Sequence, residues 1–144
     1  MIEIKVLGDN DASILMNVAP GVFDNPVDLR ATDEFLRDRR HHLAVAVEDG
    51  VVVGFVSALH YIHPDKPRPE LWINEVGVAP THQERGLGKK LLRSILEVAQ
   101  RLGCAEAWVL TDRSNFPATR LYSSMDGAES KDQLMFTFHL NSRP

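Results

Sequence analysis

The stretch that decides the fold is Leu71–Ala99, LWINEVGVAPTHQERGLGKKLLRSILEVA. Its first nine residues are mostly apolar, β-branched or aromatic and lack helical spacing, which predicts a buried strand. Pro80 ends that strand, and a short polar turn follows. From Leu87 onward, apolar residues recur at helical spacing up to Leu102. The stretch therefore predicts a strand, a glycine-rich turn and a helix.

The glycine-rich turn has the chemistry of a phosphate site. A helix that begins near Gly86 leaves its first amide N–H groups without intrahelical partners, and the helix dipole adds positive charge there. Gly86 and Gly88 let a pyrophosphate approach the backbone, and Arg85, Lys89 and Lys90 add charge nearby. The turn lacks the Gly-Lys-Ser/Thr ending of a P-loop, and it has only one Gly-x-Gly pair where a dinucleotide fingerprint needs three glycines. The sequence thus predicts a phosphate site of another kind.

The turn resembles the acyl-CoA-binding signature Gln/Arg-x-x-Gly-x-Gly/Ala of the GCN5-related N-acetyltransferase (GNAT) family. Gln83, Gly86 and Gly88 occupy the signature positions, and Val78-Ala79-Pro80 matches the usual lead-in. The competing interpretation is that the glycines only form a tight strand-to-helix turn. The resemblance implies that acetyl-CoA is the co-substrate. The residues it assigns to the cofactor are Val76, Val78, Gln83, Glu84, Arg85, Gly86, Leu87, Gly88, Lys89, Asn115, Ala118 and Tyr122.

Length and composition set the broad class. The chain has 144 residues, 44% of them hydrophobic and 25% charged, which predicts a single domain over residues 1–144. The formal net charge of −4 argues against a nucleic-acid partner. Cys104 is the single cysteine, so no intramolecular disulfide forms, and a reducing compartment fits. Because the sequence shows neither a signal peptide nor a run of about 18 apolar residues, we expect a cytoplasmic protein without a membrane partner.

Local patterns predict the remaining elements. Strands are expected at 2–6, 43–48, 51–60, 71–79, 105–111 and 133–140, and helices near 9–18, 32–37, 87–102 and 118–125. Asp49-Gly50 indicates a tight hairpin, and the prolines between Tyr61 and Pro69 indicate a loop. The order βααβββαβαβ departs from a doubly wound fold and predicts an α+β class with a mixed central sheet flanked by helices, as in the GNAT fold.

A second segment, Asn115–Tyr122, resembles the family pattern Asn-x-x-Ala-x-x-Leu-Tyr. The resemblance places Asn115 near the pantetheine arm and the Tyr122 hydroxyl near the CoA sulfur, where Tyr122 is the expected general acid to the departing thiolate. The family usually continues to a glycine at the position of Asp126, so the local turn is open to question. A core tyrosine with a satisfied hydroxyl is the alternative for Tyr122.

Acetyl transfer to an amine also needs a base, because an ammonium with a pKa of roughly 9 is only about 1% neutral at pH 7. Glu75 is the candidate, since it lies in the central strand where the family often carries an acidic residue, and a carboxylate in an apolar strand is costly unless it has a role. A structural hydrogen bond is the alternative. Backbone amides around Val76 and Val78 are expected to polarise the thioester carbonyl. Direct attack in a ternary complex follows from the absence of an implied nucleophile.

The acceptor is a primary amine on this interpretation. The central strand and the segment Met135–Phe138 resemble the short aminoglycoside 3-N-acetyltransferases, and carboxylates at Asp24, Asp28 and Glu75 would attract ammonium groups. Asp24 and Asp28 could equally be turn and cap residues. A peptide or protein N-terminus, a polyamine, or a non-catalytic acyl-CoA sensor remain alternatives.

Two further points complete the expected site. Tyr61 and His63 are expected along the acceptor cleft, whereas a metal site is not predicted because no third ligand follows at a suitable spacing. The family resemblance implies that a homodimer is a candidate assembly.

Overall fold

The computed structural model describes residues 1–141 and divides into two compact units. The first unit, Met1–Asp112, holds all five strands and the helix of the glycine-rich stretch. Its elements are β1 (Ile2–Val6), the 3-10 helix η1 (Ala12–Met16), α1 (Leu29–Arg37), β2 (His41–Glu48), β3 (Val51–His63), β4 (Lys66–Val78), the 3-10 helix η2 (Pro80–His82), α2 (Leu87–Arg101) and β5 (Glu106–Val109). The second unit begins at Arg113 and contains α3 (Phe116–Ser124).

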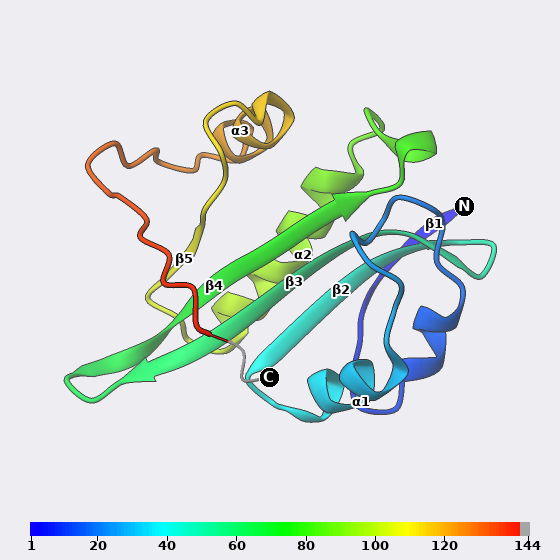
Figure 1. Cartoon of the computed structure of the whole chain (residues 1–144), viewed down its shortest axis with the longest axis horizontal. Helices are drawn as coiled ribbons and strands as arrows, with labels where there is room; N and C mark the ends of the chain where they lie inside the picture. The colour runs from blue at the N-terminus through cyan, green and yellow to red at the C-terminus, as the bar shows by residue number, and fades with distance from the viewer. Residues whose placement is uncertain (142–144) are drawn as a thin grey trace. The chain divides into compact units, whose positions relative to one another are not determined.

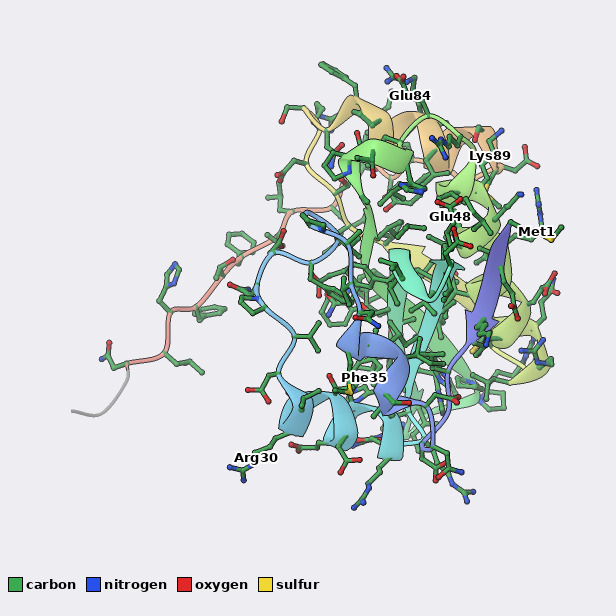
Figure 2. All side chains as sticks on the ribbon, turned by 90° about the vertical axis from the view of Figure 1, so that its right-hand side faces the viewer. Met1, Arg30, Phe35, Glu48, Glu84 and Lys89 are labelled. Carbon is green, nitrogen blue, oxygen red and sulfur yellow. The ribbon has the colours of Figure 1, made fainter. Side chains whose placement is uncertain are left out.

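The five strands form one mixed sheet in the order β1-β2-β3-β4-β5. Neighbours are antiparallel except β4 and β5, which run parallel and are joined through α2. Figures 1 and 2 show α2 on one face of the sheet and η1 with α1 on the other. The arrangement confirms the predicted α+β class with a mixed sheet and flanking helices.

The core lies between α2 and the middle strands. The helix buries one face at the spacing that the sequence predicts, namely Leu87, Leu91, Leu92, Ile95, Val98 and Ala99. Opposite it, Gly54 of β3 leaves room for Leu91, because a Cβ at residue 54 would lie 3.1 Å from Leu91 Cδ1. The fully buried Leu71 and Ile95 belong to this layer, and burying such side chains contributes about 2 kcal/mol each.

The β2–β3 hairpin is as predicted. Glu48 pairs with Val51, and the two residues between them have positive φ, 51° at Asp49 and 78° at Gly50. Two successive positive φ angles are typical of a type I′ turn, whose twist matches that of the flanking strands. This short connection fixes the end of β2 that later contacts the glycine-rich stretch.

The loop predicted between Tyr61 and Pro69 is wrong, because β3 continues to His63 and β4 already begins at Lys66. The prolines are tolerated because the β3–β4 register is irregular between Tyr61 and His63 and β5 pairs with β4 only from Glu70 onward. Pro67 and Pro69 therefore lie where a missing N–H interrupts no regular ladder.

Three further elements differ from the prediction. The first helix is a single 3-10 segment, and the second begins at Leu29 because Asp28 caps it, with Oδ1 accepting from the Ala31 N–H at 2.9 Å. Residues 133–140 form no strand within residues 1–141. Their alternation predicts one face for burial, but the apolar side chains there are exposed, Phe136 to 75%, and the sheet formed within residues 1–141 includes no strand from this segment.

Candidate functional site

Strand β4 has an open edge over its C-terminal part. It pairs with β3 up to Val78, whereas β5 pairs only with Glu70 to Ile73. The Ala79 N–H donates to the Val53 carbonyl of β3 at 2.8 Å, and successive N–H groups of a strand point to alternate edges. The N–H groups of Val76 and Val78 therefore point to the edge that β5 has left. Within the first unit, no strand pairs with that edge beyond Ile73.

A bulge in β4 marks the point of separation. Ile73 pairs with Ala58 and Glu75 pairs with Ser57, so Asn74 is an extra residue without a partner on β3. Such a bulge bends the strand that carries it and increases its twist. The bend follows directly on the last residue paired with β5. The local sequence thus separates two parallel strands and leaves backbone donors between them.

The glycine-rich turn closes the same end of β4. The Gln83 side-chain amide donates to the Val78 carbonyl at 3.2 Å, which fixes the start of the turn at the open edge. The backbone then takes positive φ at Glu84 (64°) and at Gly86 (77°), and α2 begins at Leu87. A side chain at Gly86 would point into open space, so glycine is required there by φ rather than by crowding.

The N-terminus of α2 is suited to an anion. Gly86 is the N-cap, and no side chain in the described part of the chain caps this end of the helix. The first intrahelical bond runs from the Lys90 N–H to the Gly86 carbonyl at 3.2 Å. The N–H groups of Leu87, Gly88 and Lys89 consequently have no intrahelical acceptor and add to the positive end of the helix dipole. The exposed Lys89 side chain extends from the same turn (Figure 2).

Sequence reasoning missed the contacts that anchor this turn. His82 Nε2 lies 2.8 Å from Glu48 Oε1 at the end of β2, and Thr81 Oγ1 lies 2.8 Å from His82 Nδ1. Figure 2 shows Glu48 at the same end of the sheet as Glu84 and Lys89. The hydrogen bond from His82 holds the pKa of Glu48 below its usual value. His82 lies within Leu71–Ala99, but no pattern in the sequence indicates that it pairs with Glu48, 34 residues away.

Glu75 is exposed and lies on the face of the sheet opposite α2. Its cross-strand partner is Ser57, and two residues earlier on β3 Phe55 stacks on Phe23 with ring centroids 4.1 Å apart. The loop that carries Phe23 therefore lies on the same face as Glu75. The sequence argument from the cost of burying a carboxylate does not apply, because water reaches Glu75.

The loop between η1 and α1 forms a groove of about 560 Å³. Its lining includes Leu15, Met16, Phe23, Asp24, Pro26 and Leu29. The structure thus separates the two aspartates singled out from the sequence: Asp24 lines the groove, whereas Asp28 caps α1 with one carboxylate oxygen.

Tyr61 and His63 lie at the other end of β4. The Tyr61 hydroxyl donates to Glu70 Oε1 at 3.1 Å and accepts from Trp108 Nε1 at 2.6 Å, and His63 Nε2 lies 3.0 Å from Glu70 Oε2. Although burial opposes it, the hydrogen bonds from Tyr61 and His63 hold the pKa of Glu70 below its usual value. Glu70 precedes Glu75 by five residues, about 17 Å of extended strand. The structure therefore does not bring Tyr61 and His63 to Glu75.

The second unit holds the remaining candidates on one short helix. Asn115 Oδ1 accepts from the Ala118 N–H at 3.2 Å and so caps α3, and burial raises the pKa of the Tyr122 hydroxyl. After the helix Asp126 takes a φ of 65°, and the Gly127 N–H donates to the Tyr122 carbonyl at 2.9 Å. Asp126 therefore adopts the left-handed conformation in which the resembled pattern has glycine, and the turn is made without it.

Two further features concern metals and membranes. Over residues 1–141, no three His, Cys, Asp or Glu side chains gather in a way that could hold a metal ion. No helix in that part of the chain has the length and apolar character needed to cross a bilayer.

Comparison with known proteins gives consistent matches. The model of the acetyltransferase (GNAT) family matches residues 12–126. N-acetyltransferase 8 of Rattus norvegicus is 30% identical over 104 residues, which are 72% of this chain and 47% of that protein. An aminoglycoside N(6′)-acetyltransferase type 1 of Salmonella typhimurium is 26% identical over 100 residues, 66% of this chain and 68% of that one. The chain thus spans about half the length of the mammalian relatives it matches.

Solved structures share the fold. An aminoglycoside acetyltransferase from an uncultured soil metagenomic sample, in complex with trehalose, superposes with a TM-score of 0.82 at 20% identity over 97% of both chains. A ribosomal-protein-alanine N-acetyltransferase from Brucella melitensis reaches 0.75 at 20% identity, covering 97% of this chain and 100% of that one.

Proposed function

Because the chain belongs to the GNAT acetyltransferase family, we propose that it transfers an acetyl group from acetyl-CoA to a primary amine by direct attack in a ternary complex. The observation that carries the proposal is the pair of outward N–H groups on the open edge of β4, next to the uncapped N-terminus of α2. These two sets of donors follow one another along the chain, as a long ligand with a carbonyl and a pyrophosphate requires.

The proposed division of labour follows from the chemistry of each group. The N–H groups of Val76 and Val78 bind the acyl-pantetheine arm and polarise the thioester carbonyl. The amides of Leu87 to Lys89 receive the pyrophosphate, with Arg85 and Lys89 as counter-charges. Gln83 holds the turn in place through the Val78 carbonyl rather than through the ligand.

Glu75 is proposed as the base that takes a proton from the acceptor ammonium. Its support is its exposure on the face that the η1–α1 loop covers, beside the bulge where β4 leaves β5. Tyr122 is proposed, from the family resemblance, as the acid that protonates the leaving thiolate.

The proposed acceptor is an aminoglycoside. The Salmonella relative and several structures of the same fold carry that activity in their names, and Asp24 lines a groove of a size that small molecules occupy. The sequence resemblance favours acetylation at the 3-N position, whereas the name of the Salmonella relative gives the N(6′) position. Identifying the acetylated nitrogen in the product distinguishes the two positions. A peptide N-terminal amine is the second candidate, favoured by the Brucella structure.

The experiment is release of free CoA from acetyl-CoA across aminoglycosides, polyamines, amino acids and short peptides, with mass and NMR analysis of each product. Acetylated aminoglycoside at low micromolar acceptor supports the proposal, and acetylated peptide supports the second candidate. Glu75→Gln serves as the control variant, since it keeps shape and removes the base. Tight acetyl-CoA binding with no acceptor turned over by the wild type contradicts the transferase and favours an acyl-CoA sensor.

A further inference from the structure

Ser57 is a buried polar residue without a partner. The residue is 7% exposed, and its hydroxyl oxygen makes no hydrogen bond with any of residues 1–141. Leaving a buried hydroxyl unpaired destabilises a fold, and most buried polar groups in proteins are satisfied. A buried hydroxyl without a hydrogen-bond partner calls for an explanation, and the residue opposite it on β4 provides one.

The strand register places Ser57 directly opposite Glu75. Cross-strand partners project from the same face of a sheet with Cβ atoms about 5 Å apart. Glu75 has an exposed carboxylate, and the ion pairs and side-chain hydrogen bonds found within residues 1–141 do not include it. A donor without an acceptor thus faces an acceptor without a donor, one residue past the bulge at Asn74.

Solvent does not satisfy the hydroxyl in place of Glu75. The Ser57 oxygen has less than 1 Å² of accessible surface, so no water reaches it from bulk. The Glu75 side chain, in contrast, is long and exposed. Because the Ser57 oxygen is covered in this structure, the carboxylate reaches it only when the groups that cover the oxygen move as Glu75 changes rotamer.

We propose that Ser57 is a positioning residue for Glu75: when substrates bind, its hydroxyl donates a hydrogen bond to one carboxylate oxygen and holds the other toward the acceptor amine. Ser57 keeps its own proton throughout. The ammonium proton passes to the second oxygen of Glu75, and the neutral amine then attacks the thioester carbonyl. As the carbon–sulfur bond breaks, its electron pair leaves with the sulfur, and the CoA thiolate takes the proton that Tyr122 donates. The second proton, which the nitrogen loses on becoming an amide, restores the Tyr122 hydroxyl. The inference rests on the proposed function, because it assigns Glu75 its partner in that reaction.

The test is a double-mutant cycle with Ser57→Ala and Glu75→Gln, assayed with the best acceptor of the amine panel. Because a hydrogen bond to a charged group is lost, Ser57→Ala is expected to lower kcat roughly tenfold. The KM for acetyl-CoA should not change, since the cofactor donors lie on the other edge of β4. In the Glu75→Gln background, Ser57→Ala should have no further effect, because Ser57 acts only through Glu75.

Two variants separate positioning from packing. Ser57→Thr keeps the hydroxyl and should retain most of the activity. The melting temperature of Ser57→Ala should equal or exceed that of the wild type, because an unsatisfied polar group is removed. Thr32→Ala, which deletes a buried hydroxyl in α1, is the matched control and should leave kcat unchanged.

The outcomes distinguish the inference from the proposed function. A wild-type kcat in Ser57→Ala, an equal loss in both backgrounds, or a lost activity that accompanies a clearly lower melting temperature each overturns the role of Ser57 and leaves the transferase standing. An absence of turnover in the wild type overturns the proposed function and this inference together.

Discussion

His82 Nε2 lies 2.8 Å from Glu48 Oε1, and this hydrogen bond ties the turn between β4 and α2 to the end of β2. The His82 side chain is only 13% exposed, so the contact is sheltered from solvent on the histidine side. The turn carries the backbone donors proposed for the cofactor, and its position relative to the sheet depends on few other side-chain contacts in the described part of the chain.

Glu48→Ala should therefore weaken acetyl-CoA binding by about three- to tenfold, as expected for loss of a hydrogen bond to a charged group. The kcat at saturating acetyl-CoA should change little, because no group proposed for the chemistry is removed. Calorimetric Kd and steady-state KM measure the effect. Glu97→Ala, which removes an exposed carboxylate from α2, is the matched charge control. An unchanged Kd for Glu48→Ala would show that the turn is held without this contact.

Gly86→Val should weaken acetyl-CoA binding by at least tenfold. The residue has a φ of 77° at the start of α2, and a β-branched side chain resists this left-handed conformation at a cost of about 1–2 kcal/mol. The variant should therefore move the first amides of the helix. Gly103→Val places the same strain (φ 76°) beyond the C-terminus of α2 and should cost similar stability with no change in Kd. Equal binding losses in both variants would indicate general destabilisation.

Gly77→Ala should raise the KM for the acceptor and lower stability by roughly 1–3 kcal/mol through overpacking. A Cβ at this position would clash with the Val22 carbonyl oxygen and lie 2.7 Å from Phe55 Cε1, so the loop leading to Asp24 has to move. Gly54→Ala is the control on the opposite face, where a Cβ would lie 3.1 Å from a flexible leucine side chain and 3.2 Å from the Gly77 carbonyl oxygen, contacts that a shift of a few tenths of an ångström relieves. It should leave the acceptor KM unchanged, and a shift equal to that of Gly77→Ala would contradict the role of the loop.

Tyr122→Phe should lower kcat by roughly 10- to 100-fold and leave acetyl-CoA affinity nearly intact, because only the proposed proton donor is removed. Calorimetry and pre-steady-state release of CoA measure the two effects separately. Loss of binding instead would assign the hydroxyl a structural role. Phe116→Tyr, an exposed position on the same helix, is a control that adds a phenol without placing it at residue 122.

Acidification should destabilise the fold between pH 6.5 and about 4 through His42. Burial, together with His60 and His41 nearby, lowers the pKa of His42 to about 4. As the pH falls, His42 of the unfolded chain becomes protonated near pH 6.5, whereas His42 of the folded chain stays neutral until about pH 4. The contribution of His42 to the free energy of unfolding is therefore fully present above pH 6.5 and is lost as the pH falls towards 4. Urea unfolding at pH 7 and pH 4.5 measures the change. His42→Gln should flatten this dependence, although His60, whose pKa burial also lowers, and the Asp38–Arg40 pair remain.

The sequence predicted the parts of the fold that local chemistry determines. Residues 87–101 formed the expected amphipathic helix, and Asp49-Gly50 formed the expected hairpin, because each depends on neighbours within a few positions. The prolines at 67 and 69 misled the prediction, since their tolerance depends on which edge of β4 is paired, a tertiary property.

The candidate site divides in the same way. Gly86 and the donors around it follow from the local pattern, whereas the Glu48–His82 contact and the pairing of Ser57 with Glu75 depend on strand register. Tyr61 and His63 were placed near the acceptor by their position in an assumed loop. The segment is instead the end of β3 and the start of β4. There the side chains of Tyr61 and His63 lie on the same face as Glu70 of β4 and hydrogen-bond to it.

The open edge of β4 has a further consequence for the protein between catalytic cycles. A strand edge with outward N–H groups is a template on which another chain can add a strand, and proteins usually protect such edges. In the proposed function, the acyl-CoA arm occupies this edge for as long as it is bound. Bound co-substrate then blocks strand addition at this edge, and its release exposes the edge again. The ligand-free protein is therefore the form most prone to self-association through β4.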